Sequence, residues 1–291
     1  MAPGTTAVID DPDLARRFQG LERLYGVAGA ARLRAAHVVV IGIGGVGSWA
    51  AEALARSGVG TLSLLDFDQV AESNVNRQLH ALGSTLGMAK VHAMAQRILD
   101  INPSCHVRAI EEFASPQNWP AILGDDAPPV SAVIDACDQV KTKTALAAWS
   151  WGQPLHWVCV GAAGGKRLAH EVRVDDLSRV THDPLLAQVR YRLRREHGAP
   201  AASSKHASKA AAILHLPCVF SQEAVRAADT SCEVATDGSL NCQGYGSLVS
   251  VTATFGMAAA GWVINQIATE KVSHTAKMRY NSRLRSAHNA D

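Results

Sequence analysis

A glycine-rich turn between two apolar segments constrains this chain more than any other feature. The β-branched run at 36–42 predicts a buried parallel strand, and GIGGVG follows it at 42–47. The Ala/Leu-rich segment that ends at Gly58 predicts a helix. In this context glycines permit a tight turn and let a phosphate approach the free N–H groups of the helix N-terminus. The pattern predicts a nucleotide site at Gly42, Gly44, Gly45 and Gly47.

Apolar and amphipathic segments continue to alternate after this turn. We expect further strands at 61–68, 105–113, 127–138 and 155–165, and further helices at 14–36, 86–103 and 141–152. Such β-α-β alternation is typical of an α/β protein with a doubly wound, mostly parallel sheet. The alternation ends near residue 170, and the residues beyond it are polar and irregular.

The length and composition fit one large domain. The chain has 291 residues, of which 47% are hydrophobic and 19% charged, as in soluble globular proteins. We expect a single domain with a Rossmann-like half that binds the nucleotide and an irregular half that binds the substrate. The boundaries are a flexible tail at 1–13, a domain at 14–270 with halves at 36–170 and 171–270, and a flexible basic tail at 271–291.

The six cysteines and the longest uncharged segment bear on the compartment. No CxxC pair is present, so the spacing argues against a structural zinc site, and a chain of this length does not need disulfides. We therefore expect a reducing, cytoplasmic environment.

Residues 246–268 carry no charge and are long enough to span a bilayer, but they are rich in small residues. This composition favours a helix buried on all sides over membrane association.

Polar residues gather directly after the second predicted strand. Asp66 stands where a carboxylate would accept hydrogen bonds from ribose hydroxyls, and Asp68 follows it. Up to this point NAD remains an alternative. Asn74, Asn76, Arg77 and Lys90 favour a triphosphate instead, because arginine bridges two phosphate oxygens and lysine adds a mobile charge. A surface ion-pair cluster is the alternative interpretation.

A second pair of acids follows the fourth predicted strand. Asp135 and Asp138 would lie at the same carboxyl edge as the glycine turn. Mg²⁺ is bound through one or two carboxylates together with substrate phosphates, so either acid can serve, and Asp138 is the preferred ligand. The alternative is that Asp138 caps the helix that follows.

Several stretches together resemble a known family. GIGGVGSWAAEALARSGVGTLSLLDFDQVAESNVNRQ, LGMAK and VIDACD are similar to the ubiquitin-activating superfamily. RFQGLERLYG, NRQLHAL, INPSC, GAAGG, DPLLAQVRYRLRREHG, LPCVFSQEAV and VTATFG resemble the tRNA threonylcarbamoyladenosine dehydratases within it. The resemblance spans roughly residues 17–270.

The resemblance implies a reaction and its cofactors. Enzymes of this family use ATP to cyclise the threonylcarbamoyl group on adenosine 37 of tRNA. The substrate carboxylate attacks the α-phosphate of ATP, and an internal nucleophile then displaces AMP. Arg77, Lys90 and Mg²⁺ held by Asp138 would stabilise the charge on the pyrophosphate. The small residues of GAAGG at 161–165 would border the substrate carboxylate.

Two features depart from relatives that activate ubiquitin-like proteins. The chain lacks their zinc-binding cysteine pairs, and Gly20 stands where an N-terminal helix usually carries a second arginine. Arg17 or Arg23 would replace that arginine, reaching across the interface of an expected homodimer. Cys232 is a candidate reactive thiol in a polar stretch, although cyclisation does not require a thioester.

The partners follow from charge and from the resemblance. The net charge of +2 excludes a global basic field, so a tRNA would bind a local patch. The candidate contacts are Arg190, Arg192, Arg194, Arg195, Lys205 and Lys209. Some members of the family are linked to a cysteine desulfurase or sulfur acceptor.

Three alternative functions stay open, namely an adenylating enzyme for a sulfur-carrier protein, a non-catalytic nucleotide-binding scaffold and an NAD-linked dehydrogenase.

Overall fold

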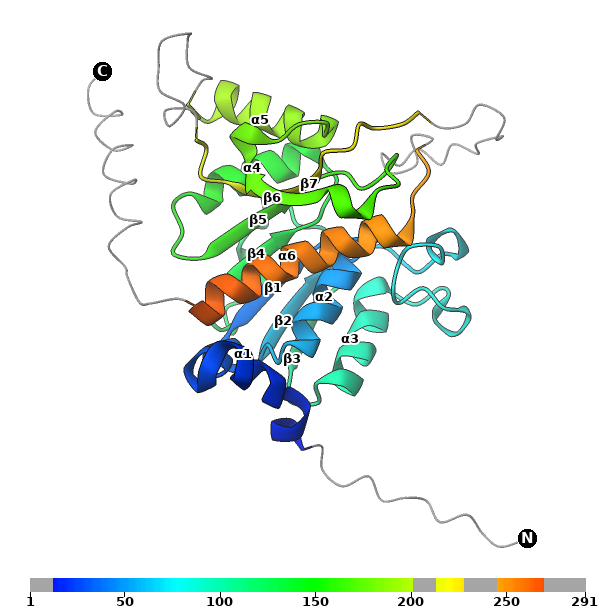
Figure 1. Ribbon diagram of the computed structural model, residues 1–291, viewed down its shortest axis with the longest axis vertical. Coiled ribbons are helices and arrows are strands. Elements are labelled where there is room, and N and C mark those ends of the chain that lie inside the picture. Colours follow the sequence, from blue (N-terminus) through cyan, green and yellow to red (C-terminus); the bar gives the residue numbers. More distant parts are fainter. Residues whose placement is uncertain (1–12, 201–212, 228–244, 270–291) are drawn as a thin grey trace, which may run out of the picture.

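The computed structural model describes residues 13–200, 213–227 and 245–269, which build one seven-stranded sheet (Figure 1). The strand order is β3-β2-β1-β4-β5-β7-β6, and all neighbours are parallel except β6 and β7. The strands are β1 His37–Ile41, β2 Thr61–Leu65, β3 His106–Ile110, β4 Ala132–Asp135, β5 His156–Val160, β6 Val172–Asp176 and β7 Pro217–Ser221. The prediction of a doubly wound, mostly parallel α/β sheet is confirmed.

Helices cover both faces of the sheet. One face packs against α1 (Leu14–Ala35), α2 (Gly47–Arg56), α3 (Lys90–Ile101) and α6 (Val249–Thr269), and the other packs against α4 (Val140–Ser150) and α5 (Pro184–Glu196). In Figure 1, α6 (orange) crosses the central strands beside α2. Because both faces are buried, β1 is apolar at every position after His37. Short 3₁₀ helices lie at Glu72–Asn74, Gly83–Thr85, Ala121–Leu123, Ala169–Glu171 and Leu177–Arg179.

The strands and helices are shorter than the apolar runs predicted. β2 ends at Leu65, so Asp66 and Asp68 lie in the loop beyond the strand. β4 begins only at Ala132, because Pro128 and Pro129 have no N–H to donate to a neighbouring strand. The sheet also extends past residue 170, since β7 inserts between β5 and β6.

Helix α6 differs from the prediction that it is buried on all sides. Met257, Gly261 and Asn265 form an exposed stripe along one face, while the opposite face packs on α2 and the sheet. The segment 246–268 therefore lacks charged residues because α6 packs closely on its neighbours along one face, and not because the whole helix is buried. In the part of the chain that the structure describes, no helix is both long enough and apolar enough to cross a membrane.

Helix α6 approaches α2 closely at Gly256. A Cβ atom at this position would lie 2.4 Å from the carbonyl oxygen of Val46 and 2.8 Å from the Cβ of Trp49. Val46 is the residue that precedes α2, so this contact fixes the end of the glycine loop. A Cβ atom at Gly261, on the exposed stripe, would touch no described atom within 4 Å.

This pair of glycines gives a matched test of the helix packing. Gly256→Ala is expected to lower the free energy of unfolding by about 2 kcal/mol, because the methyl group would overlap a rigid backbone. Gly261→Ala on the same helix should raise that free energy by up to about 1 kcal/mol, since alanine favours helix. Urea denaturation measures both. Equal effects of the two substitutions would contradict the packing argument.

Candidate nucleotide site at the carboxyl edge of the sheet

The glycine loop connects β1 to α2 with almost no space for side chains. Gly42 has a φ of +85°, a conformation that favours glycine. A Cβ atom at Gly47 would lie 1.8 Å from the carbonyl oxygen of Gly42. The Ser48 N–H donates to the Gly44 carbonyl at 3.1 Å and so closes the first turn of α2. The loop is therefore a compact backbone surface in front of a helix N-terminus, as a phosphate site requires.

Asp66 ties this loop to the end of β2. Its carboxylate accepts hydrogen bonds from the N–H groups of Ile43 at 2.7 Å and Asp68 at 2.9 Å. The side chain is buried, and burial raises its pKa above the usual value although Lys90 and the two N–H groups act to lower it. A carboxylate has about four acceptor sites, so Asp66 can still accept from a ribose.

Lys90 begins α3 and faces the two acids. Its Nζ lies 2.7 Å from Oδ2 of Asp68 and 3.9 Å from Oδ1 of Asp66, and its side chain is buried. Because two carboxylates surround one ammonium group, the ion triad holds the lysine beside the glycine loop. The predicted grouping of Asp66, Asp68 and Lys90 is thus present in the structure.

Arg77 lies over the glycine loop, but its guanidinium group is held by local contacts. Nη1 donates to the Ser73 carbonyl at 2.6 Å and to Oδ1 of Asn76 at 2.9 Å. The arginine stem lies 3.3 Å from where a Cβ of Gly45 would be. The Arg77 carbonyl accepts a hydrogen bond from the Trp49 indole at 3.0 Å, which anchors the segment to α2.

The two predicted asparagines have mainly structural contacts. The Asn74 side chain is buried and accepts from the N–H of Ala71 at 3.1 Å, closing the 3₁₀ turn. The exposed Asn76 donates to the Ser247 carbonyl at 3.2 Å, so it links this loop to the approach to α6. The Asn74 carbonyl accepts from the Arg77 N–H at 3.0 Å, and the Asn76 side chain accepts from the Arg77 guanidinium group.

Asp135 and Asp138 have different environments at the end of β4. Asp135 is fully buried, and its Oδ1 lies 2.9 Å from Nζ of Lys143, which also donates to the Asp135 carbonyl at 2.7 Å. Asp138 is half-buried in the following loop. The N-cap residue of α4 is Gln139, so Asp138 does not occupy the capping position. Asp138 is therefore the more accessible of the two acids at this edge.

Two further residues of the site were not singled out from the sequence. Gln78 Oε1 and both ring nitrogens of His80 are buried without a hydrogen-bond partner among the described residues. Gln78 Nε2 is 4.0 Å from the position of a Gly44 Cβ, and burial together with the charge of Lys90 lowers the pKa of His80 to about 4. The stretch NRQLHAL carries part of the family resemblance, but residue type alone gave no signal for these two side chains.

Among the described residues, two of the arginines predicted to contact tRNA are bound to backbone carbonyls. Arg190 donates to the carbonyls of Leu177 and Val180, and Arg194 donates to the carbonyl of Pro200. On α5, Arg195 is exposed and lies near Tyr191, and Arg192 is close to Glu196. Lys205, Lys209 and Cys232 lie outside the described residues.

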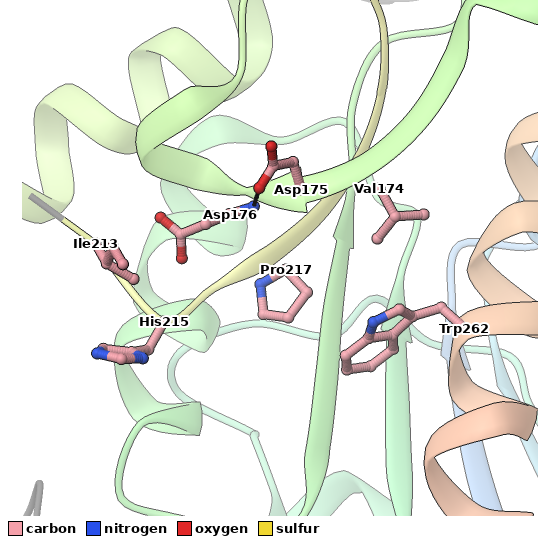
Figure 2. Close-up of a pocket in the computed structure, with 7 residues that line it drawn as sticks. All are labelled: Val174, Asp175, Asp176, Ile213, His215, Pro217 and Trp262. Atoms are coloured by element: carbon pink, nitrogen blue, oxygen red, sulfur yellow. Dashed lines mark hydrogen bonds between the residues drawn. The ribbon is translucent and has the colours of Figure 1, made fainter. Parts of the chain in front are cut away.

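The open pocket in Figure 2 lies at the opposite edge of the sheet. It has a volume of about 400 Å³ and is lined by Val174, Asp175, Asp176, Ile213, His215, Pro217 and Trp262. Pro217 begins β7 and Asp176 ends the antiparallel β6, so this is the amino edge of the parallel strands. The Asp176 carboxylate accepts from the N–H groups of Ser178, Leu214 and Leu216. The pocket is thus lined by structural contacts and is separate from the nucleotide site.

Comparison with known proteins identifies the class. Residues 15–289 match the ThiF family. The tRNA threonylcarbamoyladenosine dehydratase of Haemophilus influenzae is 39% identical over 269 residues, covering 92% of this chain and 99% of the relative. That of Escherichia coli is 38% identical over 260 residues, covering 87% and 93%. The chain therefore belongs to the ThiF family and, within it, groups with the tRNA threonylcarbamoyladenosine dehydratases.

Solved structures agree with this placement. The crystal structure of the E. coli tRNA N6-threonylcarbamoyladenosine dehydratase in complex with ATP has a TM-score of 0.76 and 36% sequence identity. The match covers 95% of this chain and 99% of that chain. A complex of the same E. coli enzyme with AMP also has a TM-score of 0.76. The resemblance expected from the sequence motifs is confirmed.

The lowered pKa of His80 predicts a pH dependence of stability. The folded pKa of about 4 lies below the ordinary value of 6.5, so the unfolded chain binds the proton more readily. The stability that the neutral His80 ring contributes is complete above pH 6.5 and is lost as the pH falls towards 4. The free energy of unfolding should therefore be about 2 kcal/mol lower at pH 5 than at pH 7.

Urea denaturation of the wild type and of His80→Asn at pH 7 and pH 5 measures this contribution. The variant lacks the titrating ring, so its stability should change by about 2 kcal/mol less between the two pH values. An identical pH dependence of the two proteins would contradict the assignment.

Proposed function

We propose that this chain is an ATP-dependent dehydratase that cyclises threonylcarbamoyladenosine at position 37 of tRNA, releasing AMP and pyrophosphate. The observation that carries the proposal is the gathering of Arg77, Lys90 and Asp66 around the glycine loop of a chain so similar to the dehydratases. The cytoplasmic location expected from the cysteines is part of the same proposal, and the four cysteines among the described residues are free thiols.

The site fits an adenosine triphosphate. The glycine loop offers N–H groups to phosphates, and Asp66 offers acceptor sites to the ribose. The exposed rings of Phe67 and Phe113 lie 5.4 Å apart beside Asp66 and offer an apolar surface to the base. The unpartnered Oε1 of Gln78 near Gly44 is a buried acceptor that a bound ligand or water would satisfy.

The acids at this edge also fit Mg²⁺. Within the described ranges no three His, Cys, Asp or Glu side chains form a closed metal cluster, but Mg²⁺ bound to phosphates needs only one or two carboxylates. Asp138 would hold the ion, because the Asp135 carboxylate is taken by Lys143. When bound, Mg²⁺ would neutralise charge on the phosphates.

The reaction proceeds in two displacements at this edge. An oxygen of the substrate carboxylate attacks the α-phosphorus of ATP, and the bond from that phosphorus to the bridging oxygen breaks to release pyrophosphate. A nucleophile within the threonylcarbamoyl group then attacks the activated carbonyl carbon, and AMP leaves with the former carboxylate oxygen. The nucleoside therefore loses one molecule of water. Arg77 and Lys90 would stabilise the negative charge that builds on the leaving pyrophosphate.

Arg77 needs little rearrangement for this role. Among the described residues, its guanidinium group is held by one carbonyl and one amide oxygen, so a phosphate, a stronger acceptor, can replace them. Lys90 is already desolvated between two acids, which strengthens its interaction with incoming charge. Cys232 remains a candidate thiol only, since the displacement of AMP by an internal nucleophile needs no thioester.

We also propose a homodimer in which α1 of each copy approaches the site of the other. Leu24 and Val27 expose more than two-thirds of their surface on α1, an apolar face open to a partner. Arg17 donates to the carbonyls of Asp100 and Ile101 in its own chain, whereas Arg23 donates, within the described part of the chain, to Gln19 of the same helix. Arg23 is therefore the better candidate for the missing arginine. Only the family resemblance supports a cysteine desulfurase component as a second partner.

The test of the proposed function is AMP and pyrophosphate formation from ATP and Mg²⁺. We expect AMP only with tRNA that carries threonylcarbamoyladenosine, together with a loss of about 18 Da from the nucleoside. Arg77→Ala should lower kcat by at least about 100-fold, because it removes charge stabilisation from the leaving group. Arg173→Ala, at an exposed position on the edge strand β6, is the matched control and should retain full activity.

Other outcomes would favour the alternatives. Pyrophosphate exchange stimulated by a sulfur-carrier protein and not by tRNA would indicate the adenylating enzyme for that carrier. ATP binding without turnover would indicate the scaffold, and tight NAD binding without ATP exchange would indicate a dehydrogenase.

A further inference from the structure

Three buried ionised side chains lie beneath the loop 161–165, outside the nucleotide site. They are Lys166, Asp183 and Glu223, with exposed fractions of 2%, 4% and 8%. Burying charges is costly unless each finds partners, so a cluster of this kind indicates a strongly defined local geometry. The three side chains come from the ends of β5 and β7 and from the start of α5.

Asp183 joins the loop to helix α5. Its Oδ1 accepts from the N–H of Leu186 at 2.9 Å, which caps the helix, and its Oδ2 accepts from the N–H of Ala162 at 2.9 Å. A Cβ atom at Gly161 would lie 1.9 Å from Oδ2 of Asp183, so only glycine leaves room for this carboxylate. The helix and the loop are therefore held as one unit.

Lys166 joins the same loop to the end of β7. Its Nζ donates to the carbonyls of His182 at 3.0 Å and Glu223 at 2.7 Å. The ammonium group thus holds the backbone of His182, next to Asp183, and the backbone of Glu223. Burial lowers the pKa of Lys166, while Asp183 and Glu223 act to raise it.

Glu223 organises two arginines. Its Oε2 accepts from the N–H groups of Arg167 and Leu168, both at 2.8 Å, and its Oε1 lies 3.3 Å from Nε of Arg226. The N–H of Arg226 also donates to the Gly165 carbonyl at 2.9 Å. One buried carboxylate therefore fixes the backbone of Arg167 and contacts the guanidinium group of Arg226, while both arginines remain exposed.

These arginines lie on the substrate side of the carboxyl edge. Arg167 follows the loop after β5, and Arg226 follows the end of β7. In the order β1-β4-β5-β7 the last strand is three strands from the glycine loop, about 14 Å at normal strand spacing. Asp138, at the end of β4, stands between the two regions.

We propose that Arg167 and Arg226, positioned by Glu223, form a binding subsite for backbone phosphates of the RNA next to the modified nucleoside. This inference rests on the proposed function. An exposed guanidinium group held by a buried carboxylate presents its remaining N–H groups in a fixed fork, which suits phosphate oxygens. Distance from the glycine loop favours RNA phosphates over those of ATP, the other source of the same chemistry. Arg167 and Arg226 would contact the substrate, and Glu223 is a positioning residue.

Steady-state kinetics of Arg226→Gln and Glu223→Gln with full-length modified tRNA tests the subsite. We expect the KM for tRNA to rise about tenfold in Arg226→Gln, the value of one lost charge-assisted hydrogen bond, with the KM for ATP unchanged. The slope of log affinity against log salt concentration should fall by about one. Glu223→Gln should raise the KM for tRNA in the same direction, since it releases the guanidinium group of Arg226.

Arg179→Gln is the matched control. Arg179 is an exposed arginine paired with Asp175 at the opposite edge of the sheet, and its loss should leave both KM values and the salt slope unchanged. Urea denaturation shows whether Glu223→Gln folds. If it does not, Arg226→Gln, which changes an exposed side chain, still decides the question.

Three results would overturn the proposal. A raised KM for ATP with an unchanged KM for tRNA would assign the arginines to the nucleotide phosphates. A lower kcat with both KM values and the salt slope unchanged would show a structural role only. Equal tRNA affinity of wild type and Arg226→Gln in filter binding without ATP would exclude the subsite. This binding test holds even if the wild type is inactive. Inactivity of the wild type would refute the proposed function separately.

Discussion

The contact between the start of α2 and the carbonyl of Gly42 determines the geometry of the whole edge. A side chain at Gly47 would collide with that carbonyl, so the helix can begin only where glycine lets it meet the end of β1. Asp66 then fixes the loop from the other side through the N–H of Ile43. Gly256 lets α6 press on Val46 and completes the support. A phosphate-binding surface of bare backbone results, held from three directions.

The charged side chains around this surface differ in how deeply they are buried and in which groups they pair with. Asp135 and Lys143 form a fully buried pair that fixes the end of β4, and because the pair is internally neutralised it adds little field at the site. Arg77 remains close to the loop, where its charge is available to phosphates, and Lys90 would exchange the exposed Asp68 for a phosphate. Glu223 and Lys166 build a separate polar framework beneath the substrate side. The carboxyl edge thus divides into a nucleotide region and the region that we propose faces the RNA.

Residues of the nucleotide region could be predicted because local pattern encodes them. A strand, a glycine turn and a helix identify the loop, and parallel strands bring Asp66 and Asp138 to the same edge. The sequence favoured Asp138 over Asp135 as the metal ligand, but it did not show that Asp135 turns into the core, because that depends on its buried pairing with Lys143 in the next helix. Gln78 and His80 were missed for the same reason, since only tertiary burial distinguishes them. The cluster of Lys166, Asp183 and Glu223 depends on β7 inserting between β5 and β6, a non-local arrangement with no sequence periodicity.

In the proposed reaction, this edge activates a substrate carboxylate by joining one of its oxygens to the α-phosphorus of ATP. The most direct measurement uses tRNA whose threonylcarbamoyl carboxylate is labelled with ¹⁸O, followed by mass spectrometry of the products. The account predicts one labelled oxygen in AMP and none in pyrophosphate, because the carboxylate oxygen that attacks phosphorus leaves with AMP. Label in pyrophosphate or inorganic phosphate, or unlabelled AMP beside cyclised nucleoside, would contradict it.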